Sequence, residues 1–97
     1  MIVRYTRQAL AELDEAFAYI ARERPRAAEA MVRAIQAAVD GLRQFPERGR
    51  PGREPGTREL VVPRTHFVVP YRIRGDEIQV LAVLHGKRDW PPTSAGG

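Results

Sequence analysis

Apolar residues recur with a helical period in the N-terminal part of the chain. Between residues 10 and 20 they follow one another at steps of three and four, and the acidic residues fall off this line, which predicts an amphipathic helix. Thr6 is a suitable N-cap for this helix, Ile2–Tyr5 before it predicts a strand, and the helix should end before Pro25. The stripe consists of Leu10, Leu13, Phe17 and Ile20.

A second and more regular stripe follows Pro25, a residue that suits the first turn of a helix. It comprises Ala28, Met31, Ile35, Ala38, Leu42 and Phe45. Gly41 lies inside this predicted helix and costs about 1 kcal/mol relative to alanine. The short connection between the two stripes predicts an antiparallel helix pair. The second stripe covers only about three heptads, so packing on a sheet is favoured over a coiled coil.

Strand patterns occupy the C-terminal part. Residues 46–56 hold three prolines and three glycines, which predicts a surface loop without regular structure. Three strands are then predicted, at Thr57–Val62, His66–Arg74 and Glu77–His85. Together with the first strand, they predict an α+β fold in which an antiparallel two-helix hairpin packs on a small antiparallel β-sheet, in the order β-α-α-β-β-β.

The last two strands form a predicted hairpin around Gly75-Asp76, with glycine where a type II′ turn needs it. In the resulting register Arg74 faces Glu77 and Tyr71 faces Val80. One face is then entirely apolar and should receive the helices. That face comprises Phe67, Val69, Tyr71, Ile73, Ile78, Val80, Ala82 and Leu84. Pro70 cannot donate a ladder hydrogen bond, so we expect a bulge or bend there.

The opposite face of this hairpin is the candidate binding surface. Continuing the register pairs Val68 with Val83 and Pro70 with Leu81, which predicts an exposed apolar strip. Arg72 and Arg74 lie at one end of the strip. Such a strip with a polar rim is typical of a protein-binding groove. The alternative is that the C-terminal tail covers it with Trp90.

The same register places His66 opposite His85, and these are the only histidines. A stable zinc site usually has three or four protein ligands, and no third is evident, so we expect no metal and no cofactor. Lys87 and Arg88 stand close to Trp90, a combination that can hold a phosphate and stack a base. Alternatively, Arg88 pairs with a carboxylate and Trp90 fills the edge of the core.

Composition narrows the class of protein. The 97 residues fit one domain, 1–97, of which about 92–97 would form a flexible tail. The sequence has no cysteine, no export signal and no apolar run that could cross a bilayer, so we expect a cytoplasmic protein. Its net charge of +4 divides into +1 for residues 1–45 and +3 for 46–97. A basic C-terminal half favours an anionic partner, although solubility alone would explain it equally well.

Three motifs in this order resemble the RelE/ParE toxin superfamily over residues 2–91. They are Phe45-Pro46-Glu47-Arg48-Gly49-Arg50, the segment His66–Ile73, and Val83-Leu84-His85-Gly86-Lys87-Arg88. The resemblance implies a toxin of a bacterial type II toxin–antitoxin module, neutralised by an antitoxin from the adjacent gene. RelE-like members cut mRNA in the ribosome, and ParE-like members are reported to poison DNA gyrase.

The ribonuclease members use several cationic side chains on the sheet. Of these, Arg88 matches the arginine of the final motif, whereas Glu59, Val61 and Val68 occupy positions where the pattern has lysine, lysine and arginine. A carboxylate in a phosphate site would repel the substrate. The ending Leu84-His85-Gly86-Lys87-Arg88-Asp89 and the loop Pro46-Glu47-Arg48-Gly49-Arg50 look more ParE-like. The resemblance therefore implies a non-hydrolytic inhibitor of gyrase.

Three functional hypotheses follow. In the first, a ParE-like toxin binds its antitoxin and target through Val68, Arg72, Arg74, Leu81, Val83, Lys87, Arg88 and Trp90. The second is a ribosome-dependent mRNA endoribonuclease with a rearranged site of His66, Arg72, His85 and Arg88, in which a histidine serves as acid or base. The third is a non-toxic, basic nucleic-acid-binding module.

Overall fold

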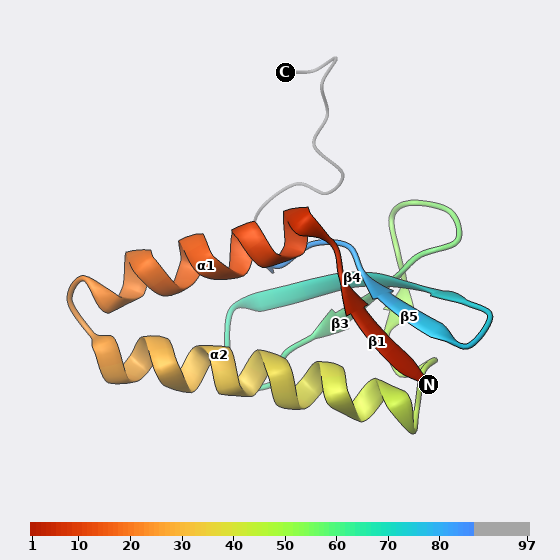
Figure 1. Ribbon diagram of the computed structural model, residues 1–97, viewed down its shortest axis with the longest axis horizontal. Helices are drawn as coiled ribbons and strands as arrows, with labels where there is room; N and C mark the ends of the chain where they lie inside the picture. Colours follow the sequence, from red (N-terminus) through yellow and green to blue (C-terminus); the bar gives the residue numbers. More distant parts are fainter. Residues whose placement is uncertain (87–97) are drawn as a thin grey trace, which may run out of the picture.

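The computed structural model describes residues 1–86 (Figure 1). It confirms the α+β class and the predicted order of the main elements. The elements are β1 (Ile2–Tyr5), α1 (Arg7–Ala21), α2 (Pro25–Asp40), the 3-10 helix η1 (Gly41–Arg43), β2 (Arg50–Pro51), β3 (Arg58–Val61), β4 (Phe67–Arg74), β5 (Glu77–Val80) and β6 (Leu84–His85). No helix in this part of the chain is long and apolar enough to cross a membrane.

The sheet is mixed rather than purely antiparallel. Its strand order is β1-β5-β4-β3-β2, and β6 pairs separately with β4. The departure from the prediction lies in β1, which runs parallel to β5 with Ile2 opposite Glu77. A second departure is β2, because Arg50 and Pro51 pair with β3. A regular element was not expected among the prolines and glycines of residues 46–56. Proline is tolerated here because β2 is an edge strand.

The two helices form an antiparallel pair that packs on the sheet (Figure 1). Thr6 is the N-cap of α1, as predicted, and its Oγ1 accepts a hydrogen bond of 3.1 Å from the Ala9 N–H. The main core lies between the helices and the sheet. Its buried members are Ala9, Leu13, Met31, Ile35, Val39, Leu42, Leu60, Val62, Val69, Tyr71, Ile78, Val80 and Val83.

The buried face of α1 is rotated from the predicted stripe, whereas α2 buries Ala28, Met31 and Ile35 as predicted. In α1, Ala9 is fully buried, whereas Leu10 and Phe17 are 48% and 38% exposed. A short alanine allows the helix to approach closely, so the larger residues lie on its flank. In α2, Val39 is buried, and Phe45 is 51% exposed. Phe45 does not follow the stripe because α2 ends at Asp40 and Gly41 begins the 3-10 helix.

The predicted hairpin register holds only near the turn. Tyr71 pairs with Val80 and Arg74 with Glu77, as expected. At the far end the register shifts by one residue, so that Val68 pairs with Leu84 rather than with Val83. The extra residue lies in the segment 81–83, which bulges away from β4. The expected irregularity therefore falls opposite Pro70 and not in β4 itself.

This shift moves side chains to the other face, because alternate residues of a strand point in opposite directions. Val83 joins the core beneath the helices and is 3% exposed. The Leu81 N–H still donates to the Pro70 carbonyl at 2.9 Å, so the shift begins after Leu81.

Candidate functional site

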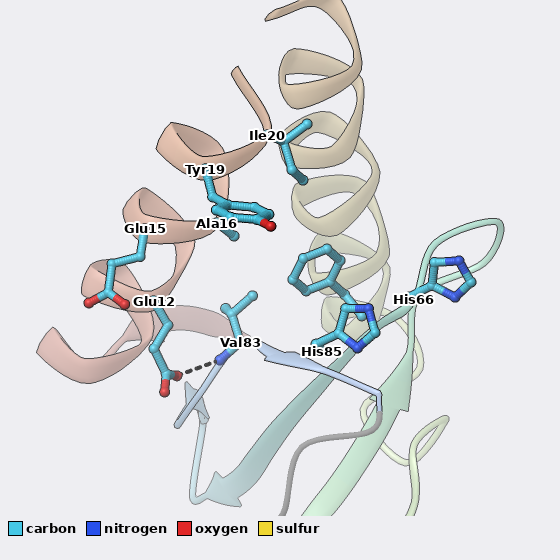
Figure 2. Close-up of a pocket in the computed structure, with 9 residues that line it drawn as sticks. Glu12, Glu15, Ala16, Tyr19, Ile20, His66, Val83 and His85 are labelled. Carbon is cyan, nitrogen blue, oxygen red and sulfur yellow. Dashed lines mark hydrogen bonds between the residues drawn. The ribbon is translucent and has the colours of Figure 1, made fainter. Parts of the chain in front are cut away.

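A cleft of about 640 Å³ opens between α1 and the end of the sheet where β4 begins and β6 lies (Figure 2). Its lining is mostly apolar, with acidic groups on one side and imidazoles on the other. The lining residues are Glu12, Glu15, Ala16, Tyr19, Ile20, His66, Phe67, Val83 and His85.

One flank of α1 forms the acidic side of the cleft. Glu12, Glu15 and Tyr19 follow at steps of three and four, so they lie along one side of the helix. Tyr19 is 75% exposed, the largest exposure among the large apolar and aromatic side chains of the described residues. The sequence analysis missed this flank because it followed only the apolar stripe of the helix.

Two side chains from the start of α1 hold the bulged segment in place. The Val83 N–H donates to Glu12 Oε1 at 2.9 Å (Figure 2), and Thr6 Oγ1 donates to the Leu81 carbonyl at 3.2 Å. A bulge leaves backbone groups outside the sheet ladder, and these contacts satisfy two of them. Glu12 is therefore tied to the floor of the cleft, whereas the Glu15 carboxylate points away from Val83 and His85, at the outer border of the cleft (Figure 2).

The two histidines meet at the other side of the cleft. Their rings stack with centroids 5.6 Å apart and an angle of 27° between the planes. The predicted backbone pairing of His66 with His85 is wrong, since Phe67 pairs with His85. The Phe67 ring lies edge-on to His85 at 5.9 Å. Both histidines are exposed. Within residues 1–86, no group of three or more residues is placed to hold a metal ion.

The predicted exposed apolar strip is not present. Val68 is 6% exposed and Val83 is 3% exposed, while Leu81 is half-buried. The physical reason is the one-residue shift, which separates Val83 from the face of Val68. Of the three, only Val83 lines the cleft.

Arg72 and Arg74 belong to the sheet face that points away from the helices. There, Arg72 Nε donates to Gln79 Oε1 at 2.7 Å, and the Gln79 amide donates to Glu77 at 2.6 Å. Arg4 on β1 closes this row with a 2.9 Å ion pair to Glu77. The hydrogen bonds from Gln79 and Arg4 lower the pKa of the Glu77 carboxyl. Arg74 stays exposed at the hairpin end.

Glu59 is the only buried charged residue in the part of the chain that the structure describes, at 2% exposure. Its carboxylate accepts hydrogen bonds from the Arg53 backbone N–H at 3.0 Å and from the Arg53 Nε at 3.1 Å. Arg50 adds an ion pair at 3.4 Å. Burial acts to raise the pKa of Glu59, but these donors outweigh it, and the pKa lies below its ordinary value.

Replacing Glu59 with glutamine tests this cluster through its pH dependence. A carboxyl with a lowered folded-state pKa stabilises the fold above its unfolded pKa of about 4.3, and this contribution is lost as the pH falls through the folded pKa. At about pH 7 we expect Glu59→Gln to lower the free energy of unfolding by about 1 kcal/mol, a modest value because both arginines are half exposed. Urea unfolding at neutral pH and near pH 3 measures the effect. An equal loss of stability at both pH values would contradict this prediction.

Tyr71 anchors the loop that follows the 3-10 helix. Its hydroxyl donates to the Pro46 carbonyl at 2.6 Å and accepts from the Gly49 N–H at 2.9 Å. Burial raises the pKa of this phenol, which keeps the donating proton in place. On the next strand, Arg58 Nη1 donates to the Glu47 and Gly49 carbonyls at 3.2 and 2.8 Å. Two side chains of the sheet thus satisfy four backbone groups of residues 46–49.

The remaining predicted contact residues, Lys87, Arg88 and Trp90, lie outside the described residues. The structure therefore brings together His66, His85 and Val83 at the cleft, and places Arg72 and Arg74 elsewhere. Arg72 is six residues along the strand from His66, which corresponds to about 20 Å at the usual rise of a strand.

Comparison with known proteins gives the class of protein that this fold defines. One solved structure, titled "Chromosomal ParDE TA system from P. aeruginosa", superposes with a TM-score of 0.81 and 34% sequence identity, covering 88% of this chain and 95% of that one. The fold is that of the RelE/ParE superfamily, the toxins of type II toxin–antitoxin modules.

Within this class the chain belongs to the ParE toxin family, "ParE toxin of type II toxin-antitoxin system, parDE", which it matches over residues 3–90. It is 45% identical over 89 residues to "Putative toxin Y4kP" of Sinorhizobium fredii, with 92% of each chain covered. It is also 31% identical over 77 residues to "Toxin RelE1" of Caulobacter vibrioides, covering 77% of this chain and 82% of that protein. Membership of this family implies an antitoxin partner.

Proposed function

We propose that this ParE-family toxin acts by binding its target, DNA gyrase, and that it does not cleave mRNA. The proposal is based on the burial of Glu59 and on its contacts with arginine. Glu59 occupies a position where the ribonuclease pattern has lysine, and its buried carboxylate is engaged by Arg53 and Arg50. These arginines neutralise a structural anion, so they are not positioned as a set to stabilise a phosphorane.

The rearranged ribonuclease site also lacks support from the geometry. His66 and His85 stack beside the cleft, whereas Arg72 is hydrogen-bonded to Gln79 about 20 Å away along the strand. An acid, a base and a cation must reach the same phosphate to cleave it. The three described members of the predicted set therefore do not form one active site.

Two assays separate the candidate functions. Purified toxin is expected to abolish supercoiling by gyrase and to leave mRNA intact in a cell-free translation reaction analysed by primer extension. Codon-positioned cuts in the mRNA would instead establish a ribonuclease. Steeply salt-dependent nucleic-acid binding without growth arrest on expression would establish the non-toxic module.

We further propose that the antitoxin neutralises the toxin by occupying the cleft between α1 and the sheet. The cleft offers an apolar floor of Ala16, Ile20 and Phe67 for an apolar side chain of the partner. Glu15 at its side is suited to a basic residue of the partner, which would add charge complementarity.

Tyr19→Glu tests this placement. Tyrosine at the mouth of a pocket is a common energetic centre of an interface, so we expect the change to weaken antitoxin binding by about 30-fold, measured by calorimetry. Leu10→Glu is the matched control, since Leu10 is an exposed apolar residue on the other flank of the same helix. Loss of affinity in the Leu10 variant with retention in the Tyr19 variant would place the antitoxin on the opposite side of α1.

A further inference from the structure

The loop that carries Phe45 and Arg48 is held rigidly from within. Tyr71, which is fully buried, binds its backbone at Pro46 and Gly49. Gly49 lies so close to Tyr71 that an added Cβ would be 2.6 Å from the ring. A segment with four backbone groups fixed by the sheet has little freedom to lose when it binds a partner.

The side chains of this rigid loop nevertheless point outward. Phe45 is 51% exposed, although it is a large apolar residue. The guanidinium of Arg48 lies over its ring, 4.9 Å from the centroid. No carboxylate within residues 1–86 forms an ion pair with Arg48. A shallow hollow of about 460 Å³ borders the pair, lined by Gln44, Phe45, Pro46, Glu47 and Arg48. Aromatic and arginine side chains are the types most enriched at energetic centres of protein interfaces.

This surface is remote from the cleft. The cleft includes Tyr19 and Ile20 near the end of α1, whereas Phe45 follows the C-terminal end of α2. The sixteen residues of α2 span about 24 Å between these two regions. In Figure 1 the turn between the helices and the end of α2 lie at opposite sides of the molecule.

The charges near Phe45 favour a protein partner over a nucleic acid. Asp40 forms an ion pair with Arg43 at 2.7 Å, and Glu47 balances Arg48 in the sequence of the loop. A polyanion would gain little from a surface whose charges cancel. A protein with an apolar pocket for the ring and a carboxylate for Arg48 would gain from both.

We infer that the Phe45–Arg48 loop is the surface by which the toxin engages its protein target, separate from the cleft for the antitoxin. This inference rests on the proposed function, because it requires a target that is a protein. The partner surface is an apolar pocket that admits the phenyl ring, with an acidic residue at its border. The loop adds no reactive group and acts by contact alone.

The test uses the full-length toxin and its variants Phe45→Ala and Arg48→Ala. We expect Phe45→Ala to raise the concentration needed to inhibit gyrase supercoiling by at least about tenfold, and to restore colony formation when it is expressed in bacteria. Its affinity for the antitoxin should be unchanged. Leu10→Ala is the matched control, because Leu10 has a similar exposure of 48% and lies on α1. It should remain as toxic as the wild type.

Each other result has a definite meaning. If the wild type and Phe45→Ala inhibit gyrase supercoiling equally, the inference is wrong and the proposed function stands. If the wild type does not inhibit supercoiling, both are wrong. Loss of antitoxin affinity in Phe45→Ala would assign the loop to neutralisation, and loss of binding to a single-stranded RNA oligomer would replace the protein partner by nucleic acid. Unchanged thermal melting of the variant excludes unfolding as the cause of lost toxicity.

Discussion

Replacing Gly49 with alanine is expected to lower the free energy of unfolding by about 3 kcal/mol. An added Cβ would lie 2.6 Å from Tyr71 Cε1, 2.8 Å from its hydroxyl oxygen and 3.1 Å from the Glu59 carbonyl. These neighbours are buried or belong to the backbone, so none can move without losing packing contacts or hydrogen bonds. Overpacking alone costs about 1–3 kcal/mol, and displacing the Tyr71 hydroxyl would add the cost of unsatisfied backbone groups.

Thermal unfolding followed by circular dichroism measures this effect. In a domain of this size, about 3 kcal/mol corresponds to a fall in Tm of about 12 to 24 °C. Gly41→Ala is the control, because the nearest atom to its added Cβ is the mobile end of Arg48 at 3.3 Å. A Gly49 variant that melts together with the Gly41 variant would show that the loop is not locked by Tyr71.

Replacing Val83 with aspartate is expected to abolish folding. Val83 is 3% exposed within the core beneath α1. The change removes about 1.5–3 kcal/mol of apolar burial and places a carboxylate beside Glu12, which already accepts the Val83 N–H. Desolvation of the new charge costs several kcal/mol more. The sum is comparable with the whole stability of a small domain.

Leu81→Asp is the comparison that makes this result informative. A regular hairpin would place residues 81 and 83 on the same exposed strip, and the two variants would then behave alike. Because the chain bulges after Leu81, which is half-buried, we expect its variant to fold and to lose only part of its stability. Far-ultraviolet circular dichroism of both proteins distinguishes the two registers. If the Val83→Asp variant folds, the observed register is contradicted.

The elements that could be predicted are those with a local cause. The Thr6 cap, Pro25 at the start of α2 and the turn at Gly75 each depend on residues that are only a few positions apart in the sequence. The family resemblance was also visible in short motifs, and the comparisons confirm it. The parallel pairing of β1 with β5 could not be predicted, since it joins residues separated by almost the whole domain.

The candidate site was harder to predict because it depends on a single residue of register. Val83 and Val68 were expected side by side on an open face, and the bulge places them on opposite faces. Nothing in the segment Leu81-Ala82-Val83 marks it as irregular, because it contains no glycine, proline, asparagine or aspartate, the residues most depleted in strands. The groups that stabilise the bulge, Thr6 and Glu12, come from α1, far away in sequence.

The environment of Glu59 could not be predicted from the sequence either. Its place in the pattern suggested only that a cation was missing from the sheet. The structure shows that two arginines of the loop, Arg50 and Arg53, converge on it. A buried carboxylate requires such partners, but their distance along the chain did not indicate which arginines they would be.

The parallel pairing of β1 with β5 has a consequence for synthesis. The first strand leaves the ribosome early, yet the residues opposite it, Glu77–Val80, are among the last of the sheet to appear. Until they emerge, β1 has no neighbour, and a nascent or truncated chain cannot complete its fold. Synthesis through Val80 therefore precedes completion of the sheet, and any surface that depends on the assembled sheet forms only after these residues have emerged.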